Sequence, residues 1–175
     1  PVDHLHALPV MVEYIRKLNI ENLIVVSPDV GGVKMASTYA TALGTRMAIV
    51  VKQRKSATET EASHIIGDVA GKNILIVDDL TETAGTIASA ARILRQNGAL
   101  DIYAGVSHSV LTDLAVERLK DSDLKELIST NSVPLRLAPG SKITALSVAG
   151  LLGEGIRRIH DDESVSSLFE VKKPK

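Results

Sequence analysis

Short apolar runs alternate with segments of helical periodicity along the chain. Runs rich in β-branched and aliphatic residues predict strands at 22–28, 46–51, 73–79, 101–108, 125–131 and 142–148. Alternation of such runs with amphipathic segments is typical of a parallel sheet covered by helices. The pattern therefore predicts an α/β fold with a parallel, twisted sheet of about five or six strands flanked by helices.

Helices are predicted between these strands from apolar residues that recur every three or four positions. One such segment runs from Ala36 to Leu43 and stops at Gly44, and another contains Ile87, Ala91 and Leu94. Glycine is the residue that most often ends a helix, because it adopts a left-handed backbone conformation without steric cost. Further helices are predicted at 114–120 and 148–159.

Length and composition narrow the class of protein. A chain of 175 residues suits one domain, expected to span residues 1–175. A net charge of −1 gives no general field for nucleic acid or an anionic membrane. Absence of cysteine excludes a thiol nucleophile and a disulfide framework, and no apolar run approaches the roughly 18 residues of a membrane span. We expect a cytoplasmic protein that binds small molecules.

Ligands of such folds bind at the carboxyl edge of the sheet, where helix amino termini converge. Loops 28–33, 52–66 and 78–86 are predicted to lie at this edge. The second of these begins a polar segment, 52–72, whose composition predicts a long loop without strands. Candidate chemistry is therefore expected in these three loops.

The stretch "VDDLTETAGT" places two carboxylates directly before a turn and a helix. Gly85 allows close approach of the backbone to a ligand, and amides at a helix amino terminus favour a phosphate. Asp78 and Asp79 can instead accept hydrogen bonds from ligand hydroxyls, or hold a divalent cation through water. A phosphorylated sugar would suit both parts of this stretch, with its hydroxyls at the aspartates and its phosphate at the helix amino terminus. The alternative is structural, with Thr81 or Thr83 capping the helix and the acids lying in the field of its first turn.

The other two loops carry weaker signals. "SPDVGGVK" combines Asp29 with Gly31 and Gly32, whose amides can face a phosphate chain while Asp29 holds a bridging metal; a simple turn is the alternative. It lacks the Walker pattern GxxxxGK[ST]. The cations of "VVKQRKS" can neutralise a polyphosphate during transfer, or form a solvated basic loop. His64 and His108 lie in no metal-binding spacing and receive no role.

Together, these motifs resemble a known family. "VDDLTETAGT" is similar to the phosphoribosyl-diphosphate motif of the type I phosphoribosyltransferase fold. Its flanks narrow the resemblance to the ribose-phosphate diphosphokinase (phosphoribosyl-diphosphate synthetase) family; they are "VVSPDVGGVKMA", "IIGDVAGKNILIVDD", "STNSVPL" and "LLGEGIRRIHDDESVSSLF". The resemblance covers nearly the whole chain and implies the carboxyl-terminal half of that enzyme, without its amino-terminal half. The first residue, Pro1, agrees with this expectation.

Site residues follow from the resemblance position by position. It implies ribose 5-phosphate binding by Asp78, Asp79, Glu82, Thr83, Ala84, Gly85 and Thr86. It places Asp29, Gly31 and Gly32 on the loop facing the transferred diphosphate, with Asp29 as a magnesium ligand. Lys52 and Arg54 would lie on the catalytic flexible loop. Ser164 and Ser166 match a segment that contributes to an allosteric site in some members.

The implied reaction transfers a diphosphoryl group from ATP to ribose 5-phosphate with Mg²⁺, giving 5-phosphoribosyl 1-diphosphate and AMP. The implied partners are these two substrates, the missing half and further copies of the chain. A noncatalytic regulatory relative is an alternative, although it predicts loss of the loop cations or the aspartate pair, which are present. A phosphoribosyltransferase is another, although no aromatic-rich base-recognition segment is found. Glu82 departs from the family's usual Asp by one methylene.

Overall fold

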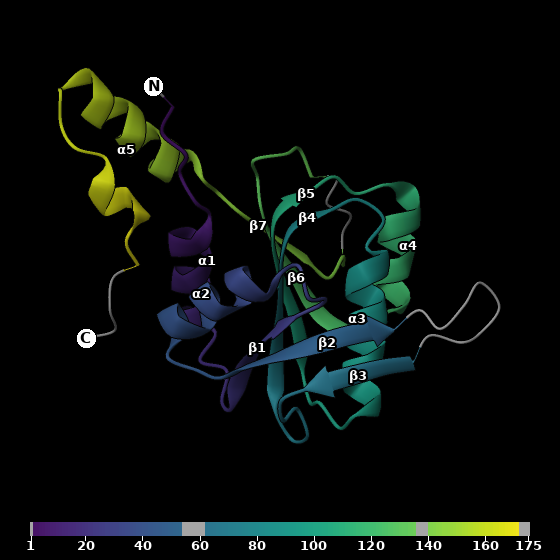
Figure 1. The fold of residues 1–175 in the computed structure, drawn as a ribbon. Coiled ribbons are helices and arrows are strands. Elements are labelled where there is room, and N and C mark those ends of the chain that lie inside the picture. Colours follow the sequence, from purple (N-terminus) through teal and green to yellow (C-terminus); the bar gives the residue numbers. More distant parts are fainter. Residues whose placement is uncertain (1, 54–61, 136–139, 172–175) are drawn as a thin grey trace.

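A computed structural model describes residues 2–53, 62–135 and 140–171. Within these ranges the strands form one seven-stranded sheet in the order β3-β2-β1-β4-β5-β6-β7 (Figure 1). The strands are β1 (Leu23–Ser27), β2 (Met47–Gln53), β3 (Ala62–Ile66), β4 (Asn73–Thr81), β5 (Ile102–Ser109), β6 (Leu124–Thr130) and β7 (Ile143–Leu146). Every neighbouring pair is parallel except β2 and β3. The predicted parallel α/β fold is confirmed.

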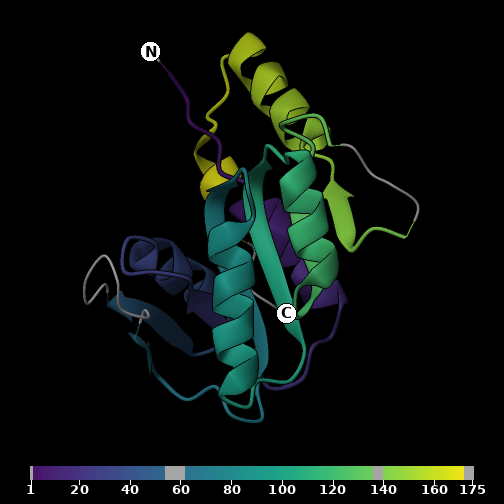
Figure 2. The same cartoon turned by 90° about the vertical axis from the view of Figure 1, so that its right-hand side faces the viewer.

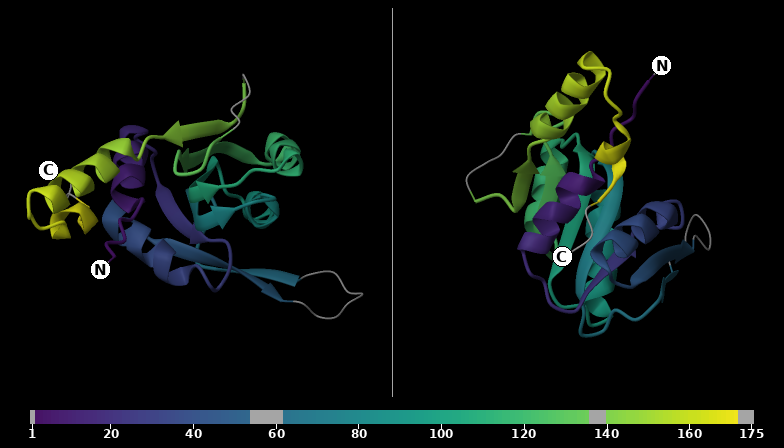
Figure 3. Two further views of the ribbon diagram at one scale, coloured as in Figure 1. Left: turned by 90° about the horizontal axis from the view of Figure 1, so that it is seen from above. Right: turned by 90° about the vertical axis from the view of Figure 1, so that its left-hand side faces the viewer.

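Helices cover both faces of this sheet. They are α1 (Leu8–Lys17), α2 (Val33–Leu43), α3 (Gly85–Gln96), α4 (Asp113–Asp121) and α5 (Ala149–His160), followed by the 3-10 turn η1 (Ser166–Phe169). α1 and α2 lie on one face, and α3 and α4 lie side by side on the other (Figures 2 and 3). α5 projects beyond the edge of this layered body (Figure 1). No helix in the described part of the chain is long and apolar enough to cross a membrane.

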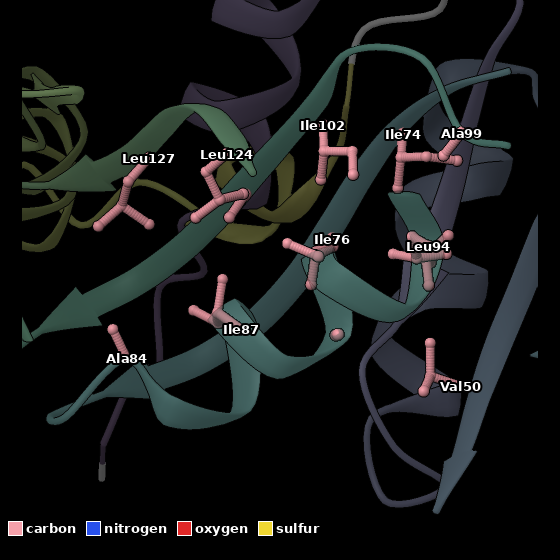
Figure 4. Packing of buried hydrophobic residues seen from close by; sticks show 14 of the residues in the cluster. Val50, Ile74, Ile76, Ala84, Ile87, Leu94, Ala99, Ile102, Leu124 and Leu127 are labelled. Atoms are coloured by element: carbon pink, nitrogen blue, oxygen red, sulfur yellow. The ribbon is translucent and has the colours of Figure 1, made fainter. Parts of the chain in front are cut away.

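Alternation along the central strands divides the core into two layers. Ile74 and Ile76 pack beneath α3 and α4, whereas Leu75 and Val77 pack beneath α1 and α2. All four side chains are fully buried, which explains why β4 reads as a continuous apolar run. Figure 4 shows the α3 side of this core, where Ile87 and Leu94 point from the helix toward the sheet.

The connections diverge between β1 and β4, which positions the site. From β1 the chain passes through α2 to β2, and from β4 it passes through α3 to β5 on the other side. Adjacent parallel strands whose crossovers leave in opposite directions open a crevice at their carboxyl ends. Two of the three predicted loops, 28–33 and 78–86, therefore follow these two neighbouring strands, at the position where such folds have that crevice.

The prediction of a long loop from residue 52 to 72 is wrong in part. β2 continues to Gln53, and residues 62–66 form β3, antiparallel to β2 at the sheet edge. An edge strand has only one partner and needs no continuous apolar run, so His64 and Ile66 are exposed while Ile65 packs on the core. Its polar composition therefore resembled a loop. α1, whose start carries Pro9 in its first turn, was not predicted either.

Candidate functional site

Asp29 organises the loop that follows β1. Its Oδ1 accepts hydrogen bonds from the amides of Gly31 (2.8 Å) and Gly32 (3.1 Å), and Ser27 Oγ donates to its carbonyl oxygen at 2.6 Å. A methyl group on Gly32 would lie 2.7 Å from Ser27 Oγ, so only glycine fits there without a rearrangement. The two amides predicted to face a phosphate chain are thus directed at the carboxylate of their own loop. Their role toward a diphosphate stays a prediction.

Asp78 and Asp79 end the hydrophobic part of β4 at the crevice. Burial raises the pKa of the half-buried Asp78 carboxyl to about 6, and the negative charges of Asp79 and Asp29 add to this rise in pKa. The Asp79 amide opposes it by donating to Asp78 Oδ1 at 3.0 Å. Since the Asp29 charge acts on Asp78, the loops after β1 and β4 form one negatively charged site. Carboxylates gathered in this way suit a cation or the hydroxyl groups of a ligand.

We expect Asp78→Asn to increase stability at neutral pH. An aspartate with a folded pKa near 6 and an ordinary value of 3.8 binds more protons in the folded chain between about pH 4 and 6. Stability contributed by this group therefore falls as the pH rises through that window, and its charge destabilises the fold above it. Because the carboxyl is half-exposed, the expected gain for asparagine is only about 1 kcal/mol at pH 7.5, or a rise in Tm of about 2–4 °C.

Thermal unfolding at pH 7.5 and pH 4.5 measures this effect, with Asp68→Asn as the control. Asp68 is an exposed carboxylate beyond the opposite end of β4, so its replacement should change the Tm little at either pH. The Asp78→Asn difference should shrink at the lower pH. An equal rise in Tm at both pH values would contradict a role for the Asp78 charge.

The 81–86 loop lies at the amino terminus of α3. Its residue Ala84 adopts the left-handed conformation (φ 54°) and buries its methyl group in the core beneath α3 (Figure 4). Thr81 and Glu82 direct their carbonyl oxygens toward the segment between β5 and α4, where Val110 and Thr112 donate their amides at 2.9 and 3.2 Å. The loop is therefore attached to the body of the domain along one side.

The structural alternative for this loop, a side-chain helix cap, is wrong. The residue preceding α3 is Ala84, no side chain among the described residues caps the helix, and the first turn contains no acidic residue. Thr81 is buried as part of β4, and Thr83 and Thr86 are exposed. The amides at the start of α3 thus lack the internal acceptor that such a cap would provide.

A magnesium ion fits this crevice only if substrate provides part of its shell. Within residues 2–53, 62–135 and 140–171, no group of three or more His, Cys, Asp or Glu side chains is placed to hold a metal ion. Mg²⁺, however, is commonly held by one or two carboxylates together with water and substrate phosphates. Asp29 and the aspartate pair provide such carboxylates; burial is the main cause of the raised pKa of Asp78, and the charges of Asp79 and Asp29 add to it.

Two cations and two serines are the remaining predicted site residues. Lys52 belongs to β2, paired with Ser63 of β3, and Arg54 lies outside the described residues. Ser164 and Ser166 are exposed beyond α5, and Ser164 Oγ donates to Ser166 Oγ at 3.0 Å. Both serines follow α5, the helix that projects beyond the edge of the layered body (Figure 1).

Sequence reasoning missed the residues that bind the 81–86 loop from the β5–α4 connection and from α4. Val110, Thr112 and Arg118 all contact its carbonyl oxygens. None lies in a motif, because a main-chain donor can be any residue except proline and Arg118 resembles an ordinary helix-surface cation. Only the pairing of β4 with β5 brings this segment to the loop.

Comparison with known proteins identifies the family. The model of the phosphoribosyl synthetase-associated domain matches residues 55–170, two thirds of the chain. The chain belongs to this family. Its curated relatives include the ribose-phosphate pyrophosphokinases of Chlorobaculum tepidum, 45% identical over 173 residues, and Aquifex aeolicus, 44% identical over 170 residues. These alignments cover 98% and 97% of this chain but 54% and 55% of the relatives. The chain thus spans about half the length of the curated relatives it matches.

Solved structures agree with this family assignment. Phosphoribosylpyrophosphate synthetase from Mycobacterium smegmatis is 36% identical with a TM-score of 0.83, over 93% of this chain and 53% of that protein. Orotate phosphoribosyltransferase from Aeropyrum pernix, at 21% identity and a TM-score of 0.55, shares the fold over 86% of this chain and 74% of its own. The resemblance to the synthetase family and its phosphoribosyltransferase-like fold, drawn from the motifs, is confirmed.

Proposed function

We propose that this chain provides the ribose 5-phosphate site and catalytic loop for diphosphoryl transfer from ATP, which yields 5-phosphoribosyl 1-diphosphate and AMP. The observation that carries the proposal is the pairing, at one crevice, of the Asp78–Asp79 carboxylates with the uncapped amino terminus of α3. One end accepts hydrogen bonds from hydroxyls and the other binds an anion. Close relatives that bear the name of a ribose-phosphate pyrophosphokinase support this reading of the site.

Peptide geometry indicates how the 81–86 loop would bind phosphate. In a trans peptide the carbonyl of one residue and the amide of the next point in opposite directions. Since the carbonyl oxygens of residues 81 and 82 are bound by the β5–α4 segment, the amides of Glu82 and Thr83 face away from it. Neither amide donates a hydrogen bond within the described residues. Together with the positive end of the α3 dipole, they form donors for a 5-phosphate.

The reaction would depend mainly on positioning and charge neutralisation. The 1-hydroxyl of the sugar attacks the β-phosphorus of ATP and loses its proton to solvent as the new oxygen–phosphorus bond forms. The bond between the β-phosphorus and the oxygen that bridges it to the α-phosphorus breaks, and AMP leaves with that oxygen. Asp78 and Asp79 would orient the sugar through its hydroxyls, and Lys52 and Arg54 would offset negative charge on the transferred group. Mg²⁺, when bound beside Asp29, would supply further charge neutralisation.

The proposal also includes the assembly in which this chemistry takes place. Relatives that are almost twice as long as the matched region suggest a further half that completes the ATP site. Association with other copies, with Ser164 and Ser166 at an effector site between them, remains part of the proposal.

Calorimetric titration of the chain with ribose 5-phosphate in the presence of Mg²⁺ tests the sugar site directly. We expect saturable binding, weaker for ribose, because the sugar alone lacks the phosphate that the α3 amides recognise. An AMP-release assay with ATP in the same sample then shows whether this chain alone turns over. Absence of ribose 5-phosphate binding would overturn the assignment of Asp78, Asp79 and the 81–86 loop.

A further inference from the structure

Three successive carbonyl oxygens of the 81–86 loop are held by one neighbouring segment. Those of Thr81 and Glu82 accept main-chain amides of the β5–α4 connection, as described above. The third, of Thr83, accepts a hydrogen bond from Arg118 Nη1 of α4 at 3.1 Å. Arg118 is thus the side chain that continues a row of main-chain contacts along the back of the loop.

The peptide that Arg118 holds is also the one under backbone strain. Its amide belongs to Ala84, which has φ 54°, a left-handed conformation that costs an alanine about 1 kcal/mol or more. Such a conformation persists only where contacts fix it from outside. Two contacts do so here: the Ala84 methyl group is buried in the core, and the preceding carbonyl is bound by Arg118.

Arg118 also lies against the first residue of α3. A methyl group placed on Gly85 would be 3.3 Å from Arg118 Nη1, tighter than an ordinary van der Waals contact. The guanidinium therefore lies at the start of the helix and keeps its charge near the helix amino terminus. Along the same groove between α3 and α4, Arg92 presents a second guanidinium without a hydrogen bond to the 81–86 loop.

We propose that Arg118 is a positioning residue for the phosphate-binding loop, an inference that rests on the proposed function. By binding the Thr83 carbonyl from the α4 side, it turns the Ala84 amide to the opposite side, toward the phosphate of ribose 5-phosphate. Arg118 acts through the peptide and need not touch the ligand. Its removal leaves the aspartates and the sugar hydroxyl contacts in place.

Calorimetry on three variants tests this role. Arg118→Met keeps the length of the side chain but removes its donors, and we expect ribose 5-phosphate affinity to fall about tenfold, as for loss of one charge-assisted hydrogen bond. Arg118→Lys, which can still donate to the Thr83 carbonyl, should recover most of the affinity. Arg92→Met, the control for charge in the same groove, should bind as the unaltered chain does. Affinity for unphosphorylated ribose should not change in any variant.

A second measurement separates this inference from the proposed function. Amide hydrogen exchange followed by NMR on the ligand-free chain should be faster in Arg118→Met at Val110, Thr112 and Ala88, whose amides donate to carbonyl oxygens of the loop. Exchange at these amides should be close to normal in Arg118→Lys and Arg92→Met. If the unaltered chain fails to bind ribose 5-phosphate, the proposed function fails, while the exchange data still decide whether Arg118 fixes the loop. Unchanged exchange in Arg118→Met, or equal affinity of this variant and a binding-competent parent chain, would overturn the positioning role.

Discussion

Replacing both Asp78 and Asp79 by asparagine should reduce ribose 5-phosphate affinity by about 100-fold or more. Each substitution replaces one carboxylate oxygen by an NH2 group, which cannot accept a hydrogen bond from a ligand hydroxyl. A hydrogen bond from a hydroxyl to a carboxylate contributes roughly 1.5–3 kcal/mol, so loss of one at each position corresponds to about two powers of ten. Asparagine has nearly the same shape as aspartate, and its side-chain oxygen at position 78 can still accept the Asp79 amide that bonds there now. The change therefore removes charge with little change of shape.

Calorimetric titration of the double variant with ribose 5-phosphate and with inorganic phosphate distinguishes the two ends of the site. Affinity for the sugar phosphate should fall, whereas any affinity for inorganic phosphate should persist because the 81–86 loop is intact. Asp68→Asn, remote from the crevice, is the matched control for a lost carboxylate. Full ribose 5-phosphate affinity in the double variant would refute the role of the aspartate pair.

Gly67→Ala should be the most destabilising single methyl addition at a glycine turn of this chain. Gly67 has φ 114°, and a methyl group there would lie 2.7 Å from the Ala48 Cβ and 3.1 Å from its Cα. Backbone strain and overpacking each cost about 1–3 kcal/mol, and neither neighbour is the flexible end of a long side chain. We expect a loss of about 3–5 kcal/mol in unfolding free energy and a Tm lower by about 10–15 °C.

Urea unfolding or a thermal scan measures this loss, and Gly44→Ala provides the matched control. Gly44 also has a positive φ, 69°, but an added methyl group would meet no atom of the described part of the chain within 4 Å. Its replacement should therefore cost only the backbone strain, about 1 kcal/mol. Equal losses in the two variants would show that crowding against Ala48 contributes nothing.

The central strands could be predicted because a strand buried on both faces requires a run of apolar residues. β4 is buried on both faces and appears as an unbroken apolar run, and Gly44 marks the end of α2. β3 could not be predicted, since an edge strand with exposed His64 and Ile66 resembles a polar loop. Pattern reasoning thus recognises elements in the core more reliably than those at the rim.

The site divides in the same way. Asp78, Asp79 and the "TETAGT" turn could be proposed as site residues from the sequence because a doubled charge and a glycine turn are local features of the chain. Arg118 was missed because it is 35 positions from its acceptor Thr83, and only the folded sheet brings them together. Likewise, no pattern shows that Asp29 accepts the amides of its own glycines.

In the loop after β1, the Asp29 carboxylate therefore competes with an anion for the amides of Gly31 and Gly32. The carboxylate of Asp29 occupies the two amides that a phosphate oxygen would need, so an incoming anion must exchange with it and cannot simply add. The free energy of anion binding at such a position is that of the new contact to the amides less that of the displaced contact to Asp29. A cation that draws Asp29 away would release both donors at once, so that metal and anion would bind there cooperatively.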